Sequence, residues 1–316
     1  MCLPVFHTFA APISLVQPLR LGVTTYFLPR FDLDSFVDAV NSFDITDTAI
    51  VPPILAKLAQ LDPEDDRLRS LRYVFCAGAP ISAELQSQLY PFIHSEATIA
   101  QVWGATEVGW VSMFAPNEKD QSGSVGTLLP GIELRIVDAV NGSVSADLLH
   151  GEALVRSPAV FSGYLDNEEA TAQAFDGEGF YRTGDRVYVN NDKIHIDGRI
   201  KDVMKVNGWQ VSPSEIEKVL LQHPEVSDAA VVGVTSIDEQ GLEITRPRAF
   251  IVTKRNSHYA NGPPSKKELQ DFVASRLVSY KRLTGGVSFV EAVPRNPTGK
   301  ILRGLLLAAQ SSGKPV

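Results

Sequence analysis

Hydrophobic and polar residues follow two rhythms along this chain, and the first is typical of helices that alternate with buried strands. Residues 36–43 and 53–61 carry apolar side chains at helical spacing, and residues 71–76 form a short apolar run that predicts a buried strand. Residues 82–90 begin with Ser-Ala-Glu, which predicts the start of a further helix. This order predicts a mainly parallel α/β layer over residues 1–121.

The second rhythm has a period of two and indicates exposed β-structure. Residues 131–137 and 151–156 alternate apolar with polar positions. Residues 187–197 continue the alternation, with a turn predicted at residues 190–192 between two strands. Residues 122–197 are therefore expected to form a small, mostly β subdomain.

A further change near Gly198 marks the expected start of a last domain, residues 198–316. Residues 212–222 begin with Ser-Pro-Ser-Glu, a capping box with proline at the first helical position. Residues 226–234 are apolar and β-branched and predict a strand, and residues 265–278 begin with a second capping box, Ser-Lys-Lys-Glu. The whole pattern predicts an α/β fold, with an N-terminal domain over residues 1–197 and a small α+β C-terminal domain.

Composition and charge narrow the class of protein. Of the 316 residues, 44% are hydrophobic and 21% are charged, which is ordinary for a soluble globular protein. The formal net charge of −8 argues against a nucleic-acid partner, because phosphate binding needs a basic face. Cys2 and Cys76 form neither a disulfide framework nor a metal pattern, so a reduced, intracellular setting is expected.

Targeting signals and membrane spans are not expected from the sequence. No apolar run reaches about 18 residues, so no membrane span is predicted. The first seven residues lack the basic and apolar regions of a secretory signal. Residues 312–316 do not form a clear peroxisomal tripeptide. A cytoplasmic location is the expectation, with a peroxisomal one left open.

Three short stretches combine glycine or proline with fixed charges. They are residues 181–185 (Tyr-Arg-Thr-Gly-Asp), 198–202 (Gly-Arg-Ile-Lys-Asp) and 294–300 (Pro-Arg-Asn-Pro-Thr-Gly-Lys). Glycine and proline favour turns, so each stretch is expected to hold an ionic group rigidly in a turn. An aspartate, an arginine and a lysine held in this way indicate a polyanionic ligand with a sugar diol, and a nucleotide fits that description.

A fourth stretch turns these patterns into a family resemblance. Residues 101–107, Gln-Val-Trp-Gly-Ala-Thr-Glu, resemble the Q-x-Y-G-x-T-E motif of the adenylate-forming superfamily of acyl-CoA synthetases, nonribosomal adenylation domains and luciferases. The three charged stretches resemble that superfamily's Y-x-T-G-D, G-R-x-[DK]-D and P-x-x-x-x-G-K motifs, in the same order. Residues 4–7 and 205–217 look like segments of 4-coumarate–CoA ligase-like enzymes. The resemblance covers essentially the whole chain.

The resemblance implies a two-step reaction. The family joins a carboxylic acid to ATP as an acyl-adenylate, releases pyrophosphate, and transfers the acyl group to a thiol, usually that of coenzyme A. It implies ATP or AMP, Mg²⁺ and coenzyme A as ligands and a carboxylic acid as substrate. Lys300 would bridge the carboxylate and the α-phosphate, Glu107 would face the Mg²⁺, and Thr106 would donate to a phosphate oxygen.

The same resemblance implies the nucleotide-binding residues. Asp185 would accept two hydrogen bonds from the ribose diol, and Arg199 would add a donor fork on the ribose side. Trp103 would offer adenine an aromatic face, although it also has the character of a buried core aromatic. The remaining implied positions are Gly78, Ala79, Pro80, Gln101 and Gly104.

The second step of the family uses a rotation of the C-terminal domain as a lid. Lys201 matches the hinge position, and the change of pattern near residue 198 places a domain edge there. The rotation would bring Gly208 and Trp209 to the thiol tunnel. Lys205 and Gln210 would join them there or only orient the surrounding hairpin, and His7 would either line the acyl pocket or serve as a structural histidine.

One departure from the family affects this interpretation. The Ser/Thr/Gly-rich loop that wraps the β- and γ-phosphates is expected upstream of Pro4 and is absent from the sequence. We therefore interpret the chain as an N-terminally truncated acyl-CoA ligase-like protein, with an incomplete N-terminal domain. ATP binding should be weakened more than AMP binding. Apolar surface near residues 1–60 should be uncovered, which favours self-association or a protein partner.

Two other functions stay open at this point. One is a non-catalytic remnant that binds a nucleotide or acyl-adenylate together with a partner, and the other is an adenylating module that loads the thiol of a carrier protein. The retained Asp185, Arg199, Lys201, Glu107 and Lys300 favour catalysis. The Gly-Trp-Gln segment at residues 208–210 favours coenzyme A over a carrier protein. The sequence does not identify the acid.

Overall fold

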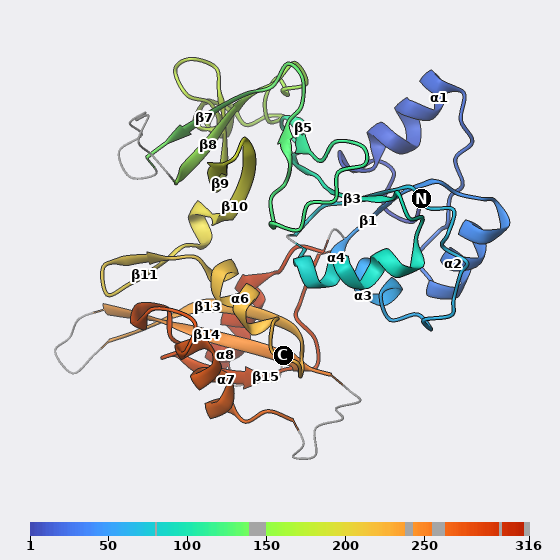
Figure 1. Cartoon of the computed structure of the whole chain (residues 1–316). Helices are drawn as coiled ribbons and strands as arrows, with labels where there is room; N and C mark the ends of the chain where they lie inside the picture. Colours follow the sequence, from blue (N-terminus) through green and yellow to red (C-terminus); the bar gives the residue numbers. More distant parts are fainter. Residues whose placement is uncertain (80, 139–149, 238–242, 255–262, 297–298, 313–316) are drawn as a thin grey trace. The chain divides into compact units, whose positions relative to one another are not determined.

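The computed structural model describes residues 1–79, 81–138, 150–237, 243–254, 263–296 and 299–312. The chain divides into two compact units, residues 1–196 and 197–316 (Figure 1). Both units combine helices with strands, which confirms the α/β class predicted from the sequence pattern. Among the described helices, none is both long enough and apolar enough to cross a membrane.

The first part of the N-terminal unit is a parallel sheet with helices between its strands. The described strands pair in the order β1-β2-β3, and both pairings are parallel. The strands are β1 (Asp47–Ile50), β2 (Tyr73–Cys76) and β3 (Thr98–Gln101). The helices are α2 (Leu33–Ser42), α3 (Pro52–Leu58) and α4 (Ala83–Leu89). The parallel α/β alternation predicted from the sequence is confirmed, with element ends shifted by a few residues.

Local side chains determine where these helices begin. The Asp32 carboxylate accepts a hydrogen bond from the Ser35 amide at 3.0 Å and caps α2. Ser82 caps α4 in the same way, because its Oγ accepts from the Leu85 amide at 3.1 Å. Pro52 occupies the first turn of α3, where its missing N–H has no helical partner to lose. The helix start predicted at residue 82 is therefore confirmed by a bond.

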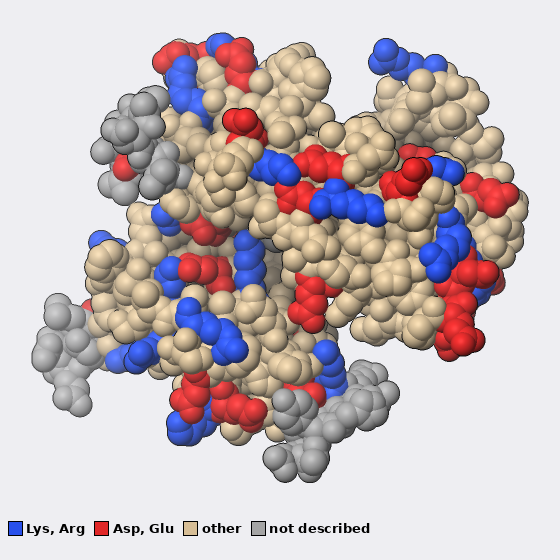
Figure 2. Space-filling view, viewed as in Figure 1, with Lys and Arg blue, Asp and Glu red and all other residues tan. Residues whose placement is uncertain are grey.

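The residues before α2 carry many exposed apolar side chains. A π-helical segment, Pro12–Val16, leads into α1 (Gln17–Leu21), which ends where Gly22 adopts a left-handed φ of +69°. The exposed fraction reaches 89% at Leu19. The exposed apolar residues of this segment are Phe6, Leu15, Val16, Leu19, Leu21, Val23, Tyr26 and Phe27. The surface around α1 is mostly uncharged in Figure 2, which agrees with the uncovered apolar surface predicted near residues 1–60.

The rest of the N-terminal unit is mainly antiparallel. Within the described residues, β4, β5 and β6 form one sheet, and β10, β9, β8 and β7 form a second in that order. The bounds are β4 (Trp103–Ala105), β5 (Gly109–Met113), β6 (Thr127–Leu128), β7 (Glu133–Val137), β8 (Gly151–Arg156), β9 (Tyr181–Asn190) and β10 (Lys193–Arg199). A short helix, α5 (Glu168–Ala174), precedes β9. The period-two pattern after residue 122 thus correctly predicted β-structure.

The prediction that residues 181–185 form a turn is wrong. These residues begin strand β9, and the pairing of β9 with β8 shifts between Glu152↔Arg186 and Leu154↔Arg182. Gly184 lies in this irregular stretch with a left-handed φ of +65°, which glycine adopts without steric strain. Glycine therefore marks a β-bulge here. The stretch at residues 198–202 is partly strand and partly a 3₁₀ turn, Ile200–Asp202.

The C-terminal unit is a small α+β structure with a sheet between helices. Strands β13 and β14 are antiparallel, and β14 and β15 are parallel. The sheet strands are β13 (Val226–Ile237), β14 (Glu243–Thr253) and β15 (Gly286–Phe289), and a separate hairpin comprises β11 (Met204–Val206) and β12 (Trp209–Val211). The helices are α6 (Pro213–Leu220), α7 (Lys266–Ala274) and α8 (Arg303–Ser312).

Strand β13 has a continuous apolar run from Ala229 to Val232 because both of its faces are buried there. Ala229 and Val231 belong to the core cluster that contains residues of α6 and α7. Ala230 and Val232 belong to a second cluster that includes Leu306 of α8. Successive side chains of a strand point to opposite faces, so the two clusters lie on opposite sides of the sheet. The strand predicted at residues 226–234 is confirmed for this reason.

Only one of the two predicted capping boxes forms its serine cap bond. The Ser265 Oγ accepts from the Glu268 amide at 3.1 Å and caps α7, although this helix ends at Ala274 instead of near residue 278. At α6 the prediction is wrong, because the Ser212 hydroxyl makes no cap bond and donates instead to the carbonyl oxygen of Asp197. A hydrogen bond to a residue 15 positions earlier has replaced the local cap bond. Proline at the first position of α6 is confirmed.

Candidate functional site

The β4–β5 hairpin carries Thr106 and Glu107 in its turn. Ala105 pairs with Gly109 across the end of the hairpin, so the chain reverses over the intervening residues. Gly104 lies close to the opposite strand, where an added Cβ would come within 2.2 Å of the Gly109 carbonyl oxygen. Any larger residue would push the strands apart. Thr106 is exposed, and Glu107 is half-buried.

Trp103 and Asp185, both predicted to bind the nucleotide, contact each other. The indole Nε1 donates to the Asp185 Oδ2 at 2.8 Å. Both residues are 5% exposed. In the bulge before Asp185, the Thr183 Oγ1 donates to the Ala153 carbonyl at 2.7 Å and accepts from the Asp185 amide at 3.0 Å. Trp103 has the burial of a core aromatic and also lies beside the carboxylate expected to hold the ribose.

Gln101 ties two loops together at the end of β3. Its Oε1 accepts from the Ile81 amide at 3.1 Å, and its Nε2 donates to the Ser124 carbonyl at 2.9 Å. The residue is 3% exposed, so these bonds replace water that the amide would otherwise bind. Gly78, with a φ of +95°, and Ala79 precede this anchor, while Pro80 lies outside the described residues. Gln101 thus positions the segment that follows β2.

Two tyrosines that sequence reasoning missed surround Glu107. The Tyr164 hydroxyl donates to the Glu107 Oε1 at 2.8 Å. Tyr181, at the start of β9, is buried near Tyr164 and Glu107. Burial, together with the negative charge of Glu107, raises the pKa of both tyrosine hydroxyls above their usual value. Neither tyrosine stands at a spacing from Glu107 that a sequence pattern would reveal.

His7 has a local partner in the structure. Its Nδ1 accepts a hydrogen bond from the Phe9 amide at 3.1 Å, and the imidazole is half-buried. This bond holds the turn that leads into the N-terminal helical segment. The bond accounts for a structural role, and the predicted acyl-pocket role stays a prediction.

In the C-terminal unit, Lys300 follows a turn that several bonds hold. The Asn296 Oδ1 accepts from the Lys300 amide at 2.9 Å. Arg295 donates to the Gly299 carbonyl at 2.7 Å and to the Asp228 carboxylate at 2.8 Å. Gly299 has a left-handed φ of +84°, and Lys300 is exposed. The turn predicted for residues 294–300 is therefore present among the residues described there, with the lysine at its end.

A buried ion pair anchors the helix that follows Lys300. The Arg303 Nη2 lies 2.8 and 2.9 Å from the two carboxylate oxygens of Glu217, which also accepts from the Val231 amide at 2.7 Å. Burial raises the pKa of the Glu217 carboxyl, and the Arg303 charge acts in the opposite direction. The pair connects α8 to α6 and β13, so the chain beyond Lys300 is held on the core of its unit.

The predicted hinge residue, Lys201, and the predicted ribose contact, Arg199, lie where β10 ends. Arg199 is the last residue of β10, and Lys201 is exposed in the 3₁₀ turn that follows. Gly198 has a φ of +142°, and an added Cβ would come within 2.3 Å of the Ser212 Oγ. The Ser212 and Ser214 hydroxyls both donate to the Asp197 carbonyl. Close packing against the start of α6 therefore requires glycine before the proposed hinge.

The residues predicted for the thiol tunnel share one hairpin. Lys205 pairs with Gln210 across β11 and β12, and Gly208 forms the turn with a left-handed φ of +83°. Trp209 stacks on Tyr280, with ring centroids 4.9 Å apart and planes 9° apart, and remains 59% exposed. Each of the four predicted tunnel residues is exposed. The stacking gives the hairpin a fixed place on its unit.

The Glu107 carboxylate suits Mg²⁺, which needs few protein ligands, better than a metal ion that requires several protein ligands. Among the described residues, no group of three or more His, Cys, Asp and Glu side chains is arranged to hold a metal. Mg²⁺ commonly keeps several waters and binds one or two carboxylates together with substrate phosphates. A lone carboxylate at the turn of the β4–β5 hairpin meets that requirement.

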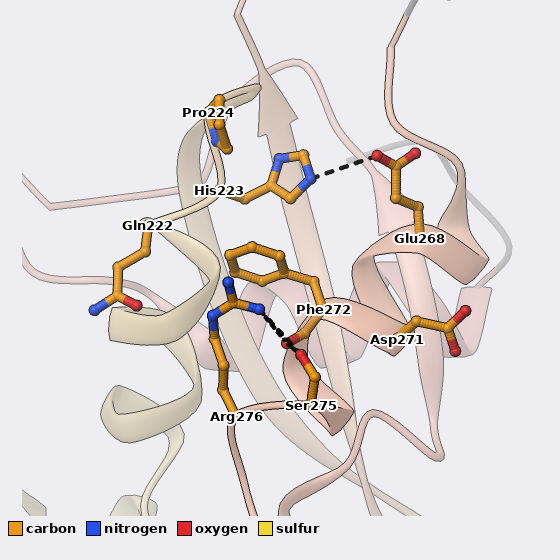
Figure 3. Close-up of a pocket in the computed structure, with 8 residues that line it drawn as sticks. All are labelled: Gln222, His223, Pro224, Glu268, Asp271, Phe272, Ser275 and Arg276. Atoms are coloured by element: carbon orange, nitrogen blue, oxygen red, sulfur yellow. Dashed lines mark hydrogen bonds and ion pairs between the residues drawn. The ribbon is translucent and has the colours of Figure 1, made fainter.

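A cavity of about 600 Å³ in the C-terminal unit lies apart from the predicted residues (Figure 3). Its walls come from the chain after α6 and from α7, and Arg276 lies 3.6 Å above the Phe272 ring. The His223 Nε2 and the Glu268 Oε1 are 3.8 Å apart at its edge. The lining residues are Gln222, His223, Pro224, Glu268, Asp271, Phe272, Ser275 and Arg276. None of them belongs to the predicted site.

Comparisons with known sequences agree with the motifs. The phenylacetyl-CoA ligase epaB of Aspergillus niger is 40% identical over 312 residues, which are 97% of this chain and 56% of that protein. The acyl-CoA ligase clz12 of Cochliobolus lunatus is 34% identical, over 96% of this chain and 86% of that protein. The chain thus spans about half the length of the first relative and most of the second.

A solved structure shares the fold. The o-succinylbenzoate CoA synthetase (MenE) from Bacillus subtilis, in complex with the acyl-adenylate intermediate OSB-AMP, superposes with a TM-score of 0.81 at 27% identity, covering 97% of this chain and 60% of that one. Family models for "AMP-binding enzyme" and "AMP-binding enzyme C-terminal domain" match residues 1–165 and 215–300. Because the first model alone matches more than half of the 316 residues, this chain belongs to the AMP-binding enzyme family.

Proposed function

We propose that this chain carries out acyl-CoA ligase chemistry, in which ATP activates a carboxylic acid and the acyl group passes to the thiol of coenzyme A. The observation that carries the proposal is the Trp103–Asp185 contact on the hairpin that holds Glu107 in its turn. One hairpin thus presents a carboxylate for a metal-bound phosphate and, through its indole, fixes a second carboxylate for a ribose. An acyl-adenylate site needs both groups.

The roles of the residues follow from their chemistry. Asp185 accepts from the ribose hydroxyls, and Arg199 adds donors on the same side. Lys300 offsets the charge that develops as the carboxylate attacks the α-phosphate, and Thr106 donates to a phosphate oxygen. Mg²⁺, when bound at Glu107, neutralises phosphate charge. Trp103, Gln101, Gly104 and residues 78–80 shape the adenine pocket.

The domain roles are part of the same proposal. Residues 1–197 act as a partial AMP-binding domain, with an α/β layer over residues 1–121 and a β-rich subdomain over residues 122–197. Residues 198–316 act as a lid that turns about Lys201. In one position the lid supplies Lys300, and in the other it presents Lys205, Gly208, Trp209 and Gln210 to coenzyme A. The protein acts in the cytoplasm.

The residues of this chain are proposed to serve the adenosine part and the α-phosphate of the nucleotide. The matched solved structure is longer, and this chain covers 60% of it. Backbone amides of a glycine-rich loop commonly bind the β- and γ-phosphates of a nucleotide.

Two alternatives have their own support. The exposed apolar residues between Phe6 and Phe27 favour a protein partner or self-association, as in a binding remnant that acts within a complex. An adenylating module that loads a carrier protein would share the first step, and the exposed Trp209 hairpin is compatible with either thiol. The ligase is favoured because Lys300 is retained in an organised turn.

Pyrophosphate exchange tests the main proposal. The purified chain is incubated with ATP, labelled pyrophosphate and a panel of acids that includes phenylacetate and o-succinylbenzoate. Label should enter ATP with at least one acid, and Lys300→Ala should abolish this. The matched control is Lys267→Ala, which removes an exposed lysine that pairs with Asp271. Absence of exchange across the panel overturns stand-alone activity.

Calorimetry with AMP separates the alternatives. If exchange is absent but AMP binds and Asp185→Ala removes the binding, the chain is a nucleotide-binding remnant. If AMP does not bind at all, the nucleotide site itself is refuted. Exchange that proceeds with transfer to a carrier protein and not to coenzyme A would establish the carrier-loading function instead.

A further inference from the structure

We propose that Tyr164 is a positioning residue that holds the Glu107 carboxylate ready for a magnesium–nucleotide complex. The proposal rests on the proposed function, because it assigns to Tyr164 a task within that site. Neither the family match nor the motifs point to Tyr164. The inference comes from the contact between two side chains that lie 57 positions apart.

The segment that contains Tyr164 makes two hydrogen bonds to Glu107. The Tyr164 hydroxyl donates to the Glu107 Oε1 at 2.8 Å. Three residues earlier, the Phe161 amide donates to the Glu107 carbonyl oxygen at 2.7 Å. One bond fixes the side chain and the other fixes the backbone, so the hairpin turn and its carboxylate are held together by the same short segment.

Tyr164 is itself held in place by its neighbours. Its amide donates to the Thr171 Oγ1 at 2.9 Å, and that hydroxyl donates to the Asn167 carbonyl at 2.9 Å. Gly163 has a φ of +147°, and an added Cβ there would meet the Thr171 side chain at 2.7 Å. The Phe161 and Tyr164 rings pack edge to face with centroids 4.9 Å apart. The phenol therefore reaches Glu107 from an anchored backbone.

Tyr181 is the buried member of the cluster. It is 7% exposed, and its phenol lies near Tyr164 and Glu107. The Phe161 and Tyr181 rings lie 5.9 Å apart and nearly perpendicular, so the same aromatic packing supports both tyrosines. The cluster thus has one carboxylate, one phenol that donates to it, a second phenol nearby and an aromatic support.

The Tyr164–Glu107 contact is better suited to preorganising the Glu107 carboxylate for a ligand than to stabilising the folded protein. Tyr164 is 39% exposed, so its loss would not leave a buried cavity. A free glutamate side chain loses rotamer freedom when it binds a metal complex, and a fixed donor removes that cost in advance. A hydrogen bond to a charged group typically changes an equilibrium by about tenfold or more, so the effect on metal-dependent binding should be measurable.

Calorimetry of ATP binding to the full chain tests this role. Affinity is measured with excess Mg²⁺ and again with EDTA, for the wild type and for Tyr164→Phe. The variant should lose about five- to tenfold of its affinity with Mg²⁺ and almost none with EDTA. Equal losses in both conditions, or no loss in either, would overturn the proposal.

The matched control is Tyr73→Phe. Tyr73 also lies in the N-terminal unit, and its hydroxyl donates to the Phe114 carbonyl at 2.9 Å. This variant removes a phenolic hydrogen bond of similar length away from Glu107. Its ATP affinity should equal that of the wild type with Mg²⁺ and with EDTA.

A nucleotide-free measurement keeps the two proposals separate. A double-mutant cycle of Tyr164→Phe and Glu107→Ala on urea unfolding reports the coupling between the side chains. We expect a coupling of about fivefold in the unfolding equilibrium constant, and a coupling factor of about one refutes the positioning role. If the wild type does not bind ATP, the proposed function fails, while the cycle still decides whether Tyr164 holds Glu107.

Discussion

The indole of Trp103 donates to the carboxylate of Asp185 over 2.8 Å, although the two residues lie 82 positions apart. Both are 5% exposed, so each supplies a polar partner that water cannot replace. The contact joins the β4–β5 hairpin to the bulge in β9. It also means that the carboxylate proposed to bind ribose is oriented by the aromatic ring proposed to flank adenine.

Asp185→Ala should destabilise the protein as well as remove AMP binding. The substitution leaves the buried indole N–H without its acceptor, which typically costs about 1–3 kcal/mol. Trp103→Phe should weaken AMP binding less, because the carboxylate remains. Urea unfolding and calorimetry measure the two effects. Asp185→Ala with unchanged stability would show that the indole bond does not form in solution.

Gly104→Ala should be strongly destabilising. The added methyl group would come within 2.2 Å of the Gly109 carbonyl oxygen, a backbone atom that cannot move without opening the hairpin. We expect a loss of about 1–3 kcal/mol of stability and weaker Mg²⁺-dependent ATP binding. The control is Gly177→Ala, where an added Cβ meets no atom within 4 Å. Equal stability of the two variants would contradict the observed hairpin geometry.

The contribution of Glu217 to stability should fall as the pH rises. Burial raises its pKa in the folded state, so the folded protein retains this proton to a higher pH than the unfolded chain does. The contribution is complete below the unfolded-state value of about 4.3 and is lost as the pH rises through the folded-state value. The difference in unfolding free energy between the wild type and Glu217→Gln, measured by urea from pH 4 to about 8, should therefore decrease.

Asp120 provides a control of opposite sign for that experiment. Burial alone would raise its pKa, but hydrogen bonds from Lys193 and Ser122 lower it. Its contribution should be complete above the unfolded-state value and lost as the pH falls. The difference between the wild type and Asp120→Asn should therefore increase with pH over the acidic range. Slopes of the same sign for both residues would refute the assignment for Glu217.

Leu19→Lys should reduce self-association of the isolated chain. Leu19 is 89% exposed and lies among the exposed apolar residues of the N-terminal segment. Light scattering after size exclusion should show less oligomer for this variant than for the wild type. The matched control is Leu165→Lys, because Leu165 is 91% exposed but lies outside that segment. A wild type that is monomeric at all concentrations would contradict self-association through this segment and leave another protein as the partner that covers it.

Much of the fold was predictable because its signals are local. The Ser82 and Ser265 hydroxyls cap their helices through bonds to residues three positions later. The apolar run in β13 was also readable, since a strand buried on both faces lacks alternation. The predictions were wrong where a side chain bonds to a group that is distant in sequence. Ser212 has the residue pattern of a cap, but its hydroxyl bonds to the Asp197 carbonyl instead.

The sequence by itself determined the family and the residue types of the candidate site, because the motifs keep their charges, glycines and order along the chain. Only the tertiary structure decided which side chains meet. Core packing between the β4–β5–β6 sheet and the β10–β9–β8–β7 sheet brings Trp103 to Asp185, and the segment before α5 brings Tyr164 to Glu107. These contacts join positions that are far apart in sequence, and no periodicity encodes them. They arise from packing, which sets the orientation of each carboxylate.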